Sequence, residues 1–394
     1  MGKPSLTGAR GDAMKRIRLV QVGISGYGRF YLHEAERAVA RGAAELAAVC
    51  LINPEEEAEA CRRLRAAGTR IFSRWDEMME AFRGEVDLCL LPVPIHLHEQ
   101  MTVRALECGM NVLVEKPLGV GSGSYACIRA AEERTGRWVA VGFQDLYRPS
   151  TAEIRGDLDA GRIGAVRSIT WQGLWPRPAE YFRRNNWAGK LTVDGRPVLD
   201  SPLNNAFAHY LTLAFHWAGA GRVPMALPQG VEAEISRCYP IETFDTAKIA
   251  TVCDTGVVLR AAATHCCPEE YPLSITVTGD TGWMRWVNNE SVEWSDGGWK
   301  EIEDWHMCLA NLFAAVLDRA AGGGADIVTS VAAYPQLLFI EKLHAAAPIR
   351  DRRNWRERIV GGQTYRYLPD IEEEFAAWIA ARPAKDLALA ADAV

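Results

Sequence analysis

The sequence lacks three features that would point to particular classes of protein. It has no basic excess: 44 lysines and arginines stand against 50 aspartates and glutamates, giving a net charge of −6. Because phosphate-backbone binding normally needs a concentrated basic face, we expect no nucleic acid partner. The ten cysteines include no CxxC pair, and residues 1–14 contain no apolar run. We therefore expect a disordered leader at 1–14, no membrane span, and a cytoplasmic protein with reduced thiols.

A metal site is also not expected. His265, Cys266 and Cys267 are ligand-type residues, but they are consecutive. Adjacent side chains on a strand point to opposite faces, so these three cannot share one small ion. The sequence therefore predicts no metal.

The length and rhythm of the chain indicate two domains. Its 394 residues suit about two domains of ordinary size. Over residues 15–147, short apolar runs alternate with helical stretches, which is typical of a parallel sheet covered by helices. The expected strands are 17–22, 46–51, 70–72, 88–91, 111–114 and 138–142, with helices near 28–41, 54–67, 75–83, 97–109 and 124–135.

Residues 148–350 have a different pattern. Turn signals at 254–256 and 296–298 predict hairpins, and therefore an antiparallel sheet that carries a few helices, near 304–320 and 327–346. Residues 351–394 are expected to form an extension with an amphipathic helix near 370–381.

A glycine-rich loop follows the first strand. A helix begins there, so a pyrophosphate could meet the helix N-terminus, and side chains would block the backbone amides. The fingerprint is imperfect, because one register puts Ser25 at the second glycine position, and a purely structural turn is the alternative. The candidate cofactor-binding residues of this loop are Gly23, Ser25, Gly26, Tyr27 and Gly28.

The second strand leaves the choice of dinucleotide open. Such a strand usually ends in an acidic residue that binds the adenosine ribose, but Leu51 stands at that place and Asn53 is the nearby polar candidate. Arg62, Arg63 and Arg65 could reach a 2′-phosphate. NAD and NADP both remain possible.

Several motifs occur together at the ends of the fourth and fifth strands and beyond. They are Pro94, His98, Ala105–Leu106–Glu107–Cys108–Gly109, Glu115–Lys116–Pro117, and the segments 141–144, 161–164 and 275–282. Their order and spacing resemble those of the Gfo/Idh/MocA oxidoreductases over most of residues 15–346. The resemblance implies an α/β N-terminal Rossmann domain, and an α+β C-terminal domain with a large, mostly antiparallel open sheet.

The resemblance also implies roles for the residues after the fifth strand. Lys116 would lie near the nicotinamide and hydrogen-bond the reacting oxygen, with Pro94, His98 and Glu115 beside the cofactor. A surface ion pair between Lys116 and Glu115 is the alternative.

A second candidate catalytic residue lies on a helix expected from about 202 to 217, capped by Asp200 or Ser201. Asn205, His209, Thr212 and His216 form a polar stripe along it. The family has Asp-x-Gly-x-His-x-x-Asp here, so the resemblance makes His209 the general acid and base, although Asn205 and Thr212 replace both aspartates. Asn205 could orient a substrate hydroxyl, or Asp200 could stand for the first aspartate. A buried structural histidine is the alternative.

The segment 181–187 resembles the family loop that overhangs the substrate. Arg183, Asn186 and Trp187 could bind hydroxyls or a carboxylate there, unless the loop is only a surface feature. The resemblance further implies a homodimer or homotetramer built through the C-terminal sheet.

The sequence thus predicts an NAD(P)-dependent dehydrogenase or reductase acting on CH–OH groups of a sugar, cyclitol or related polyol. Two alternatives stay open. One is an NAD-retaining glycosidase or lyase of the same family, and the other is a non-enzymatic sensor of a dinucleotide or sugar.

Overall fold

The computed structural model describes residues 15–381, so the expected leader at 1–14 and the end of the extension lie outside the described residues. The N-terminal part contains a six-stranded sheet in which every strand is parallel, in the order β3-β2-β1-β4-β5-β6. Its strands are β1 (Ile17–Val22), β2 (Ala44–Cys50), β3 (Arg70–Phe72), β4 (Leu88–Leu91), β5 (Asn111–Val114) and β6 (Val139–Val141). This order confirms the Rossmann arrangement and places a switch point between β1 and β4, where ligands of such sheets bind.

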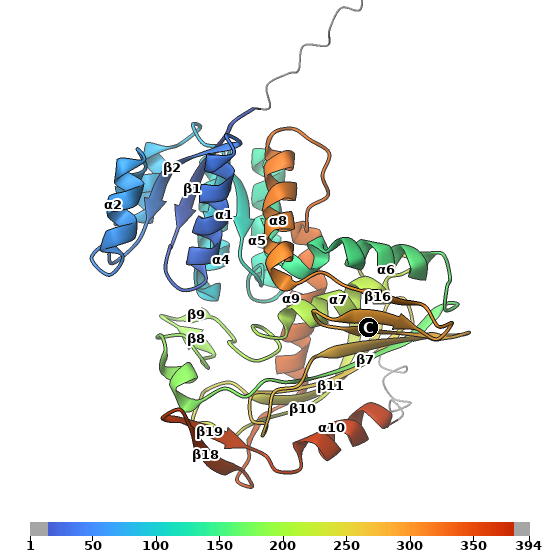
Figure 1. Ribbon diagram of the computed structural model, residues 1–394. Helices are drawn as coiled ribbons and strands as arrows, with labels where there is room; N and C mark the ends of the chain where they lie inside the picture. Colours follow the sequence, from blue (N-terminus) through green and yellow to red (C-terminus); the bar gives the residue numbers. More distant parts are fainter. Residues whose placement is uncertain (1–14, 382–394) are drawn as a thin grey trace, which may run out of the picture.

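Five helices connect these strands. They are α1 (Gly28–Ala40), α2 (Ala58–Ala66), α3 (Trp75–Ala81), α4 (His98–Glu107) and α5 (Gly121–Thr135). Helix α2 begins four residues later than expected because residues 54–57 form a turn. Figure 1 shows the strands β1 and β2 next to helices α1, α2 and α4. Except for the edge strand β3, the strands that the helices cover are almost fully buried, as the continuous apolar runs predicted.

The second sheet has nine strands in the order β16-β15-β14-β13-β7-β12-β11-β10-β17. Its pairs are antiparallel except β7 with β12 and β10 with β17, so a large, mostly antiparallel sheet is confirmed. The strands are β7 (Val166–Leu174), β10 (Pro228–Arg237), β11 (Thr246–Cys253), β12 (Val258–Thr264), β13 (Ser274–Gly279), β14 (Trp283–Val287), β15 (Ser291–Trp294), β16 (Trp299–Glu301) and β17 (Ile349–Asp351).

Helices cover parts of both faces of this sheet. Ala261 and Ala263 belong to the core that contains α7 (Ala208–Ala218), whereas Ala262 packs with Phe375 of α10 (Ile371–Ala380). Alternate residues of a strand face opposite sides, so α10 covers the face opposite α7. The predicted amphipathic helix is therefore part of the C-terminal fold. Two short antiparallel hairpins lie outside the two large sheets. They are β8 (Thr192–Val193) with β9 (Arg196–Pro197), and β18 (Arg356–Val360) with β19 (Gln363–Tyr367).

The chain returns to the first sheet after β16. Phe313 of α8 (Trp305–Ala320) packs edge-on against Tyr31 of α1, with ring centroids 5.2 Å apart. Helix α9 (Ser330–Ala346) then contacts both α5 and β10, and α6 (Pro149–Asp159) joins β6 to β7. These helices hold the two sheets together, as Figure 1 shows for α8 and α9.

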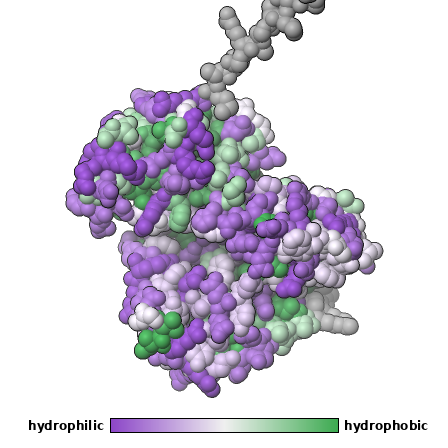
Figure 2. Space-filling view, viewed as in Figure 1, coloured by the Kyte–Doolittle hydropathy of each residue, from purple (hydrophilic) through white to green (hydrophobic). Residues whose placement is uncertain are grey.

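Hydrophilic side chains dominate the face of the molecule drawn in Figure 2, with smaller apolar patches between them. Between residues 15 and 381, no helix is both long and apolar enough to cross a bilayer.

Candidate active site

A cavity of about 1110 Å³ lies where the two sheets meet. Loops after β1, β4, β5 and β6 form one side of it, and α7 and the segment after β7 form the other. Its lining includes Ser25, Gly26, Tyr27, Pro92, Pro94, Glu115, Lys116, Gln144, Asp145, Trp175, Arg177, Arg184, Trp187, Asn205, His209, Tyr210 and Glu270.

The glycine loop is shaped to approach a ligand closely. A Cβ on Gly28 would lie 2.6 Å from the Gly23 carbonyl oxygen, so only glycine fits where β1 turns into α1. Gly26 has a φ of 55° and open space at its missing Cβ. With Ser25 and Tyr27 it lines the cavity beside a helix N-terminus. These features fit the pyrophosphate of a dinucleotide.

The end of β2 offers no carboxylate to a ribose. Leu51 is 6% exposed and packs in the core of the first sheet. Asn53 is exposed, donates from Nδ2 to Glu56 Oε1 at 2.8 Å, and is not among the lining residues. Arg62, Arg63 and Arg65, the candidates for a 2′-phosphate, do not line the cavity either, and Arg63 pairs with Glu36.

His98 lies outside the cavity and connects two of the loops that line it. It is fully buried, and its two ring nitrogens lie 2.6 Å from the Pro117 carbonyl oxygen and 2.8 Å from that of Val93. It thereby ties the loop after β4 to the loop after β5, where the Lys116–Pro117 peptide bond is cis. Pro94 lines the cavity, but His98 does not.

Lys116 points toward Asn205, in the turn that precedes α7. Its Nζ donates to the carbonyl oxygen of Asn205 at 2.9 Å and to Oδ1 of the same residue at 3.0 Å. Burial lowers the Lys116 pKa, although Glu115 and Asp200 oppose the change. Burial raises the pKa of Glu115 to about 7; this carboxyl group accepts hydrogen bonds from Tyr31 and the Lys116 amide. A surface ion pair does not describe this arrangement.

The helix that carries His209 begins later than predicted. Helix α7 starts at Ala208, not near 202, because residues 202–207 form turns. The Phe207 ring lies against Gly173, where an added Cβ would be 2.2 Å from it. Asp200 does not cap the helix: its carboxylate accepts from the Gly189 amide at 2.8 Å and from Asn205 Nδ2 at 2.9 Å. Asp200 therefore positions Asn205.

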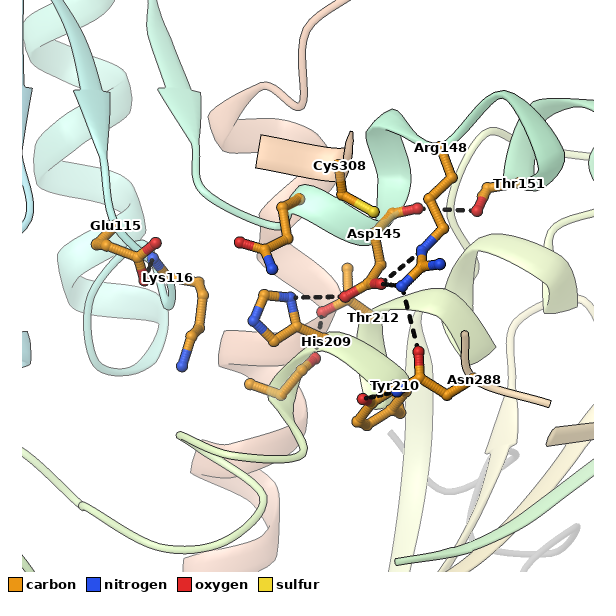
Figure 3. Close-up of polar contacts among 12 residues, drawn as sticks. Glu115, Lys116, Asp145, Arg148, Thr151, His209, Tyr210, Thr212, Asn288 and Cys308 are labelled. Carbon is orange, nitrogen blue, oxygen red and sulfur yellow. Dashed lines mark hydrogen bonds and ion pairs between the residues drawn. The ribbon is translucent and has the colours of Figure 1, made fainter. Parts of the chain in front are cut away.

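His209 lies on α7, lines the cavity and has a buried acidic neighbour, Asp145 (Figure 3). Its side chain is 13% exposed, and Nδ1 lies 3.2 Å from Asp145 Oδ2. The geometry does not meet that of a hydrogen bond, so this is a close polar contact that becomes an ion pair only when the imidazole is protonated. Burial lowers the His209 pKa to about 4, while Asp145 opposes this. The imidazole is therefore neutral near pH 7.

Asp145 is fixed by a buried arginine. Arg148 is fully buried and donates from Nε to Asp145 Oδ1 at 2.8 Å, and it also donates to the Asn288 and Asn289 side chains and the Glu303 carbonyl. Sequence reasoning missed both Asp145 and Arg148. The available signal was an acidic residue at the carboxyl end of the sixth strand.

The rest of the predicted polar stripe does not reach the cavity. The Thr212 hydroxyl donates to the Ala208 carbonyl at 2.8 Å within the helix. His216 Nδ1 lies 3.2 Å from the Pro224 carbonyl oxygen. Of the four stripe residues, the structure brings Asn205 and His209 together with Lys116.

The overhanging segment has a different register from the one predicted. Trp187 lines the cavity, but Arg183 and Asn186 do not; Arg184 and Asn185 take their places. Arg183 ends the turn η3 (Ala179–Arg183), pairs with Glu180 at 3.0 Å, and its side chain is 70% exposed. The tight turn directs Arg183 and Arg184 to different sides.

Models of both domains of one family match this chain. The model of the Gfo/Idh/MocA oxidoreductase family, NAD-binding Rossmann fold, matches residues 20–143, and the family's C-terminal domain matches residues 151–285. The chain belongs to the Gfo/Idh/MocA oxidoreductase family. Its N-terminal domain is accordingly a Rossmann domain of the NAD-binding type.

Relatives of this Gfo/Idh/MocA protein include a dTDP-3,4-didehydro-2,6-dideoxy-alpha-D-glucose 3-reductase from Streptomyces violaceoruber, 26% identical over 47% of this chain and 52% of the relative. An inositol 2-dehydrogenase from Corynebacterium glutamicum is 29% identical over 41% of this chain and 46% of the relative. The chain thus spans about half the length of these curated relatives.

Solved structures share the fold of this family member. The WlbA dehydrogenase from Bordetella pertussis, in complex with NADH and UDP-GlcNAcA, has a TM-score of 0.69 at 22% identity, covering 84% of this chain and 96% of that chain. KijD10, a 3-ketoreductase from Actinomadura kijaniata in complex with NADP and TDP-benzene, has a TM-score of 0.67 at 19% identity, covering 86% and 100%.

One ligand-type cluster in this Gfo/Idh/MocA chain lies away from the cavity. Buried Cys238, Asp245 and Cys266 place possible ligand atoms within 4.8 Å of one another. The Asp245 carboxylate already accepts from the Cys238 and Tyr239 amides at 2.7 and 2.9 Å and from the Thr246 hydroxyl at 3.0 Å. Its oxygens are engaged in holding the chain after β10, so we assign the cluster a structural role.

Proposed function

We propose that this chain is an NAD(P)-dependent dehydrogenase or reductase that acts on a CH–OH group of a sugar, cyclitol or related polyol. The convergence of Lys116, Asn205 and His209 on the cavity that contains the glycine loop carries this proposal. A bound nicotinamide would accept or donate the hydride.

The residues of the chain supply orientation and proton transfer. Lys116, held by Asn205, is a donor to the substrate oxygen and stabilises negative charge that develops on it. Neutral His209 accepts the hydroxyl proton during oxidation and returns it during reduction. Asp145 stabilises the imidazolium that forms, because its carboxylate lies beside Nδ1.

The remaining binding roles divide between the two sides of the cavity. We assign Gly23, Ser25, Gly26, Tyr27, Gly28, Pro94 and Glu115 to the cofactor side. Trp187 and Asn205 contact substrate, and Asp200 acts through Asn205. His98 positions the loop that carries Lys116 through the Pro117 carbonyl.

We also propose a cytoplasmic location and a homodimer or homotetramer that forms through the C-terminal sheet. Exposed Trp283 and Trp299, 41% and 63% accessible on β14 and β16, support an association surface at that end of the sheet. Helix α10 already covers part of the face near β12. Light scattering coupled to gel filtration measures the oligomeric state, and a monomeric molar mass would refute the proposed oligomer.

A titration with NAD, NADH, NADP and NADPH tests the functional proposal. Trp175, Trp187 and Trp305 line the cavity, so binding should quench protein fluorescence and raise the melting temperature. We expect saturable binding of at least one dinucleotide. Absence of binding by all four would refute the proposal.

A further inference from the structure

Two arginines project into the substrate side of the cavity. Arg177 and Arg184 lie on the segment between β7 and β8, and both line the same cavity as Lys116 and His209. This segment follows β7 of the second sheet, whereas the glycine loop follows β1 of the first. Their chemistry therefore bears on the substrate rather than on the dinucleotide.

Neither guanidinium group forms an ion pair with a carboxylate of the described residues. Across residues 15–381, no carboxylate oxygen lies within 4.0 Å of Arg177 or Arg184. Arg177 donates to the Pro176 carbonyl at 3.4 Å, and Arg184 to the Tyr181 carbonyl at 2.6 Å. Neighbouring Arg183, by contrast, pairs with Glu180. The two cavity arginines thus keep their charge and most of their donors available.

Aromatic rings hold both groups in place. Cζ of Arg184 lies 3.6 Å from the Tyr181 ring centroid and 5.2 Å from that of Trp187. Cζ of Arg177 lies 5.5 Å from the Tyr181 centroid and 5.8 Å from that of Trp175. Stacking orients a guanidinium group without neutralising it, which lowers the entropy lost when an anion binds.

The other charges of the cavity are largely balanced. Arg148 binds Asp145, and Lys116 interacts with Glu115 and Asp200. Glu270 is exposed on the same rim as Arg177. Burial raises the pKa of Asp200, and Arg184 opposes this, so the acids and bases of the region are nearly equal in number. The segment that carries Arg177 and Arg184 is nevertheless where guanidinium groups stand without a carboxylate of residues 15–381 at ion-pair distance.

We propose that the substrate carries a negatively charged group, a carboxylate or a phosphate, that binds Arg177 and Arg184 while its reacting carbinol lies at Lys116 and His209. Planar guanidinium groups match both anions through paired N–H donors. This inference rests on the proposed function and narrows its substrate to acidic or phosphorylated sugars and polyols.

Matched sugars test the inference on the protein loaded with its dinucleotide. D-glucose is compared with D-glucuronate and D-glucose 6-phosphate, and D-galactose with D-galacturonate, by tryptophan fluorescence and by absorbance of the reduced nicotinamide. We expect at least one anion to bind about tenfold or more tightly than its neutral partner. The uronates and the phosphate separate the two anion types.

Variants locate the effect. Arg177→Gln and Arg184→Gln should each reduce the preference for the anion about tenfold, whereas Arg183→Gln, adjacent in sequence but outside the cavity, should not. Glu270→Gln removes a negative charge from the rim and should tighten anion binding.

Equal or better binding of the neutral sugars, no binding of any anion, or a preference unchanged in both cavity variants would overturn the inference. Reduction of the nicotinamide by neutral sugars with no effect of the arginine variants would overturn it while the proposed function stands. If the anion binds tightly but no redox turnover occurs, the inferred anion site stands and the proposed redox function is refuted.

Discussion

His209 Nδ1 lies 3.2 Å from Asp145 Oδ2, a contact that joins α7 to the loop after β6. The family pattern places aspartates on the histidine's own helix segment, and this chain has Asn205 and Thr212 there. The acidic neighbour comes instead from the other side of the cavity. Charge stabilisation of an imidazolium is thus available from a residue remote in sequence.

Asp145→Asn should slow catalysis more than it weakens binding. The amide cannot stabilise protonated His209, so we expect kcat to fall by roughly 10–100-fold with KM changed little. Because Asp145 raises the His209 pKa against the effect of burial, the acidic limb of the activity profile should move to lower pH. Asp157→Asn, which removes an exposed carboxylate, is the control. An unchanged pH profile would contradict the role of Asp145.

Arg148→Met should destabilise the protein as well as reduce activity. The substitution leaves the Asp145 carboxylate buried without its partner, and the loss of one member of a buried pair costs about 3–5 kcal/mol. Denaturant unfolding measures this cost. Arg167→Met, which breaks an exposed pair with Asp280, should cost less than about 1 kcal/mol. Equal effects of the two changes would show that Arg148 is not structurally important.

Gly28→Ala and Gly26→Ala should separate close packing from backbone conformation. The added methyl at Gly28 meets the Gly23 carbonyl at 2.6 Å, so we expect about 1–3 kcal/mol of destabilisation and loss of dinucleotide binding. At Gly26 the methyl has open space, and the positive φ alone should cost about 1–2 kcal/mol. Melting curves recorded with and without the dinucleotide compare the stability and the cofactor binding of the two variants. Normal cofactor binding by Gly28→Ala would argue against the proposed phosphate loop.

Buried His265 should make stability depend on pH. Burial lowers its pKa to about 3, below about 6.5 for an unfolded chain, so the unfolded state binds the proton more readily. Its contribution is therefore complete above pH 6.5 and decreases as the pH falls toward 3. His265→Gln should lower the melting temperature at pH 7.5, through the lost contact with the Trp175 carbonyl, and the difference should narrow by pH 4.5. A constant difference would exclude this linkage.

The sequence predicted the fold where periodicity and backbone constraints act locally. The strands of the first sheet and the loop glycines are determined by apolar runs and by the lack of a Cβ, both visible in the sequence. The predicted start of α7 was wrong. Phe207 packs on Gly173, and this contact between segments distant in sequence outweighs the capping signals at Asp200 and Ser201.

The candidate site was predictable only in part for the same reason. Lys116 and His209 were found through motifs, and the structure brings both to one cavity. The role of Asp145 depends on its contact with His209, 64 positions away in the sequence. Whether Arg183 or Arg184 faces the cavity depends on a one-residue register in a tight turn. Neither leaves a periodic signal.

Hydride transfer by wild type and by two variants tests the central claim most directly. With the dinucleotide that binds and a panel of sugars, polyols and uronates, the wild type should change the nicotinamide absorbance. Lys116→Ala and His209→Ala should each lower turnover about 10²-fold or more while they still bind the dinucleotide. Unchanged turnover in both variants, or no redox change with wild type on any substrate, would contradict the account.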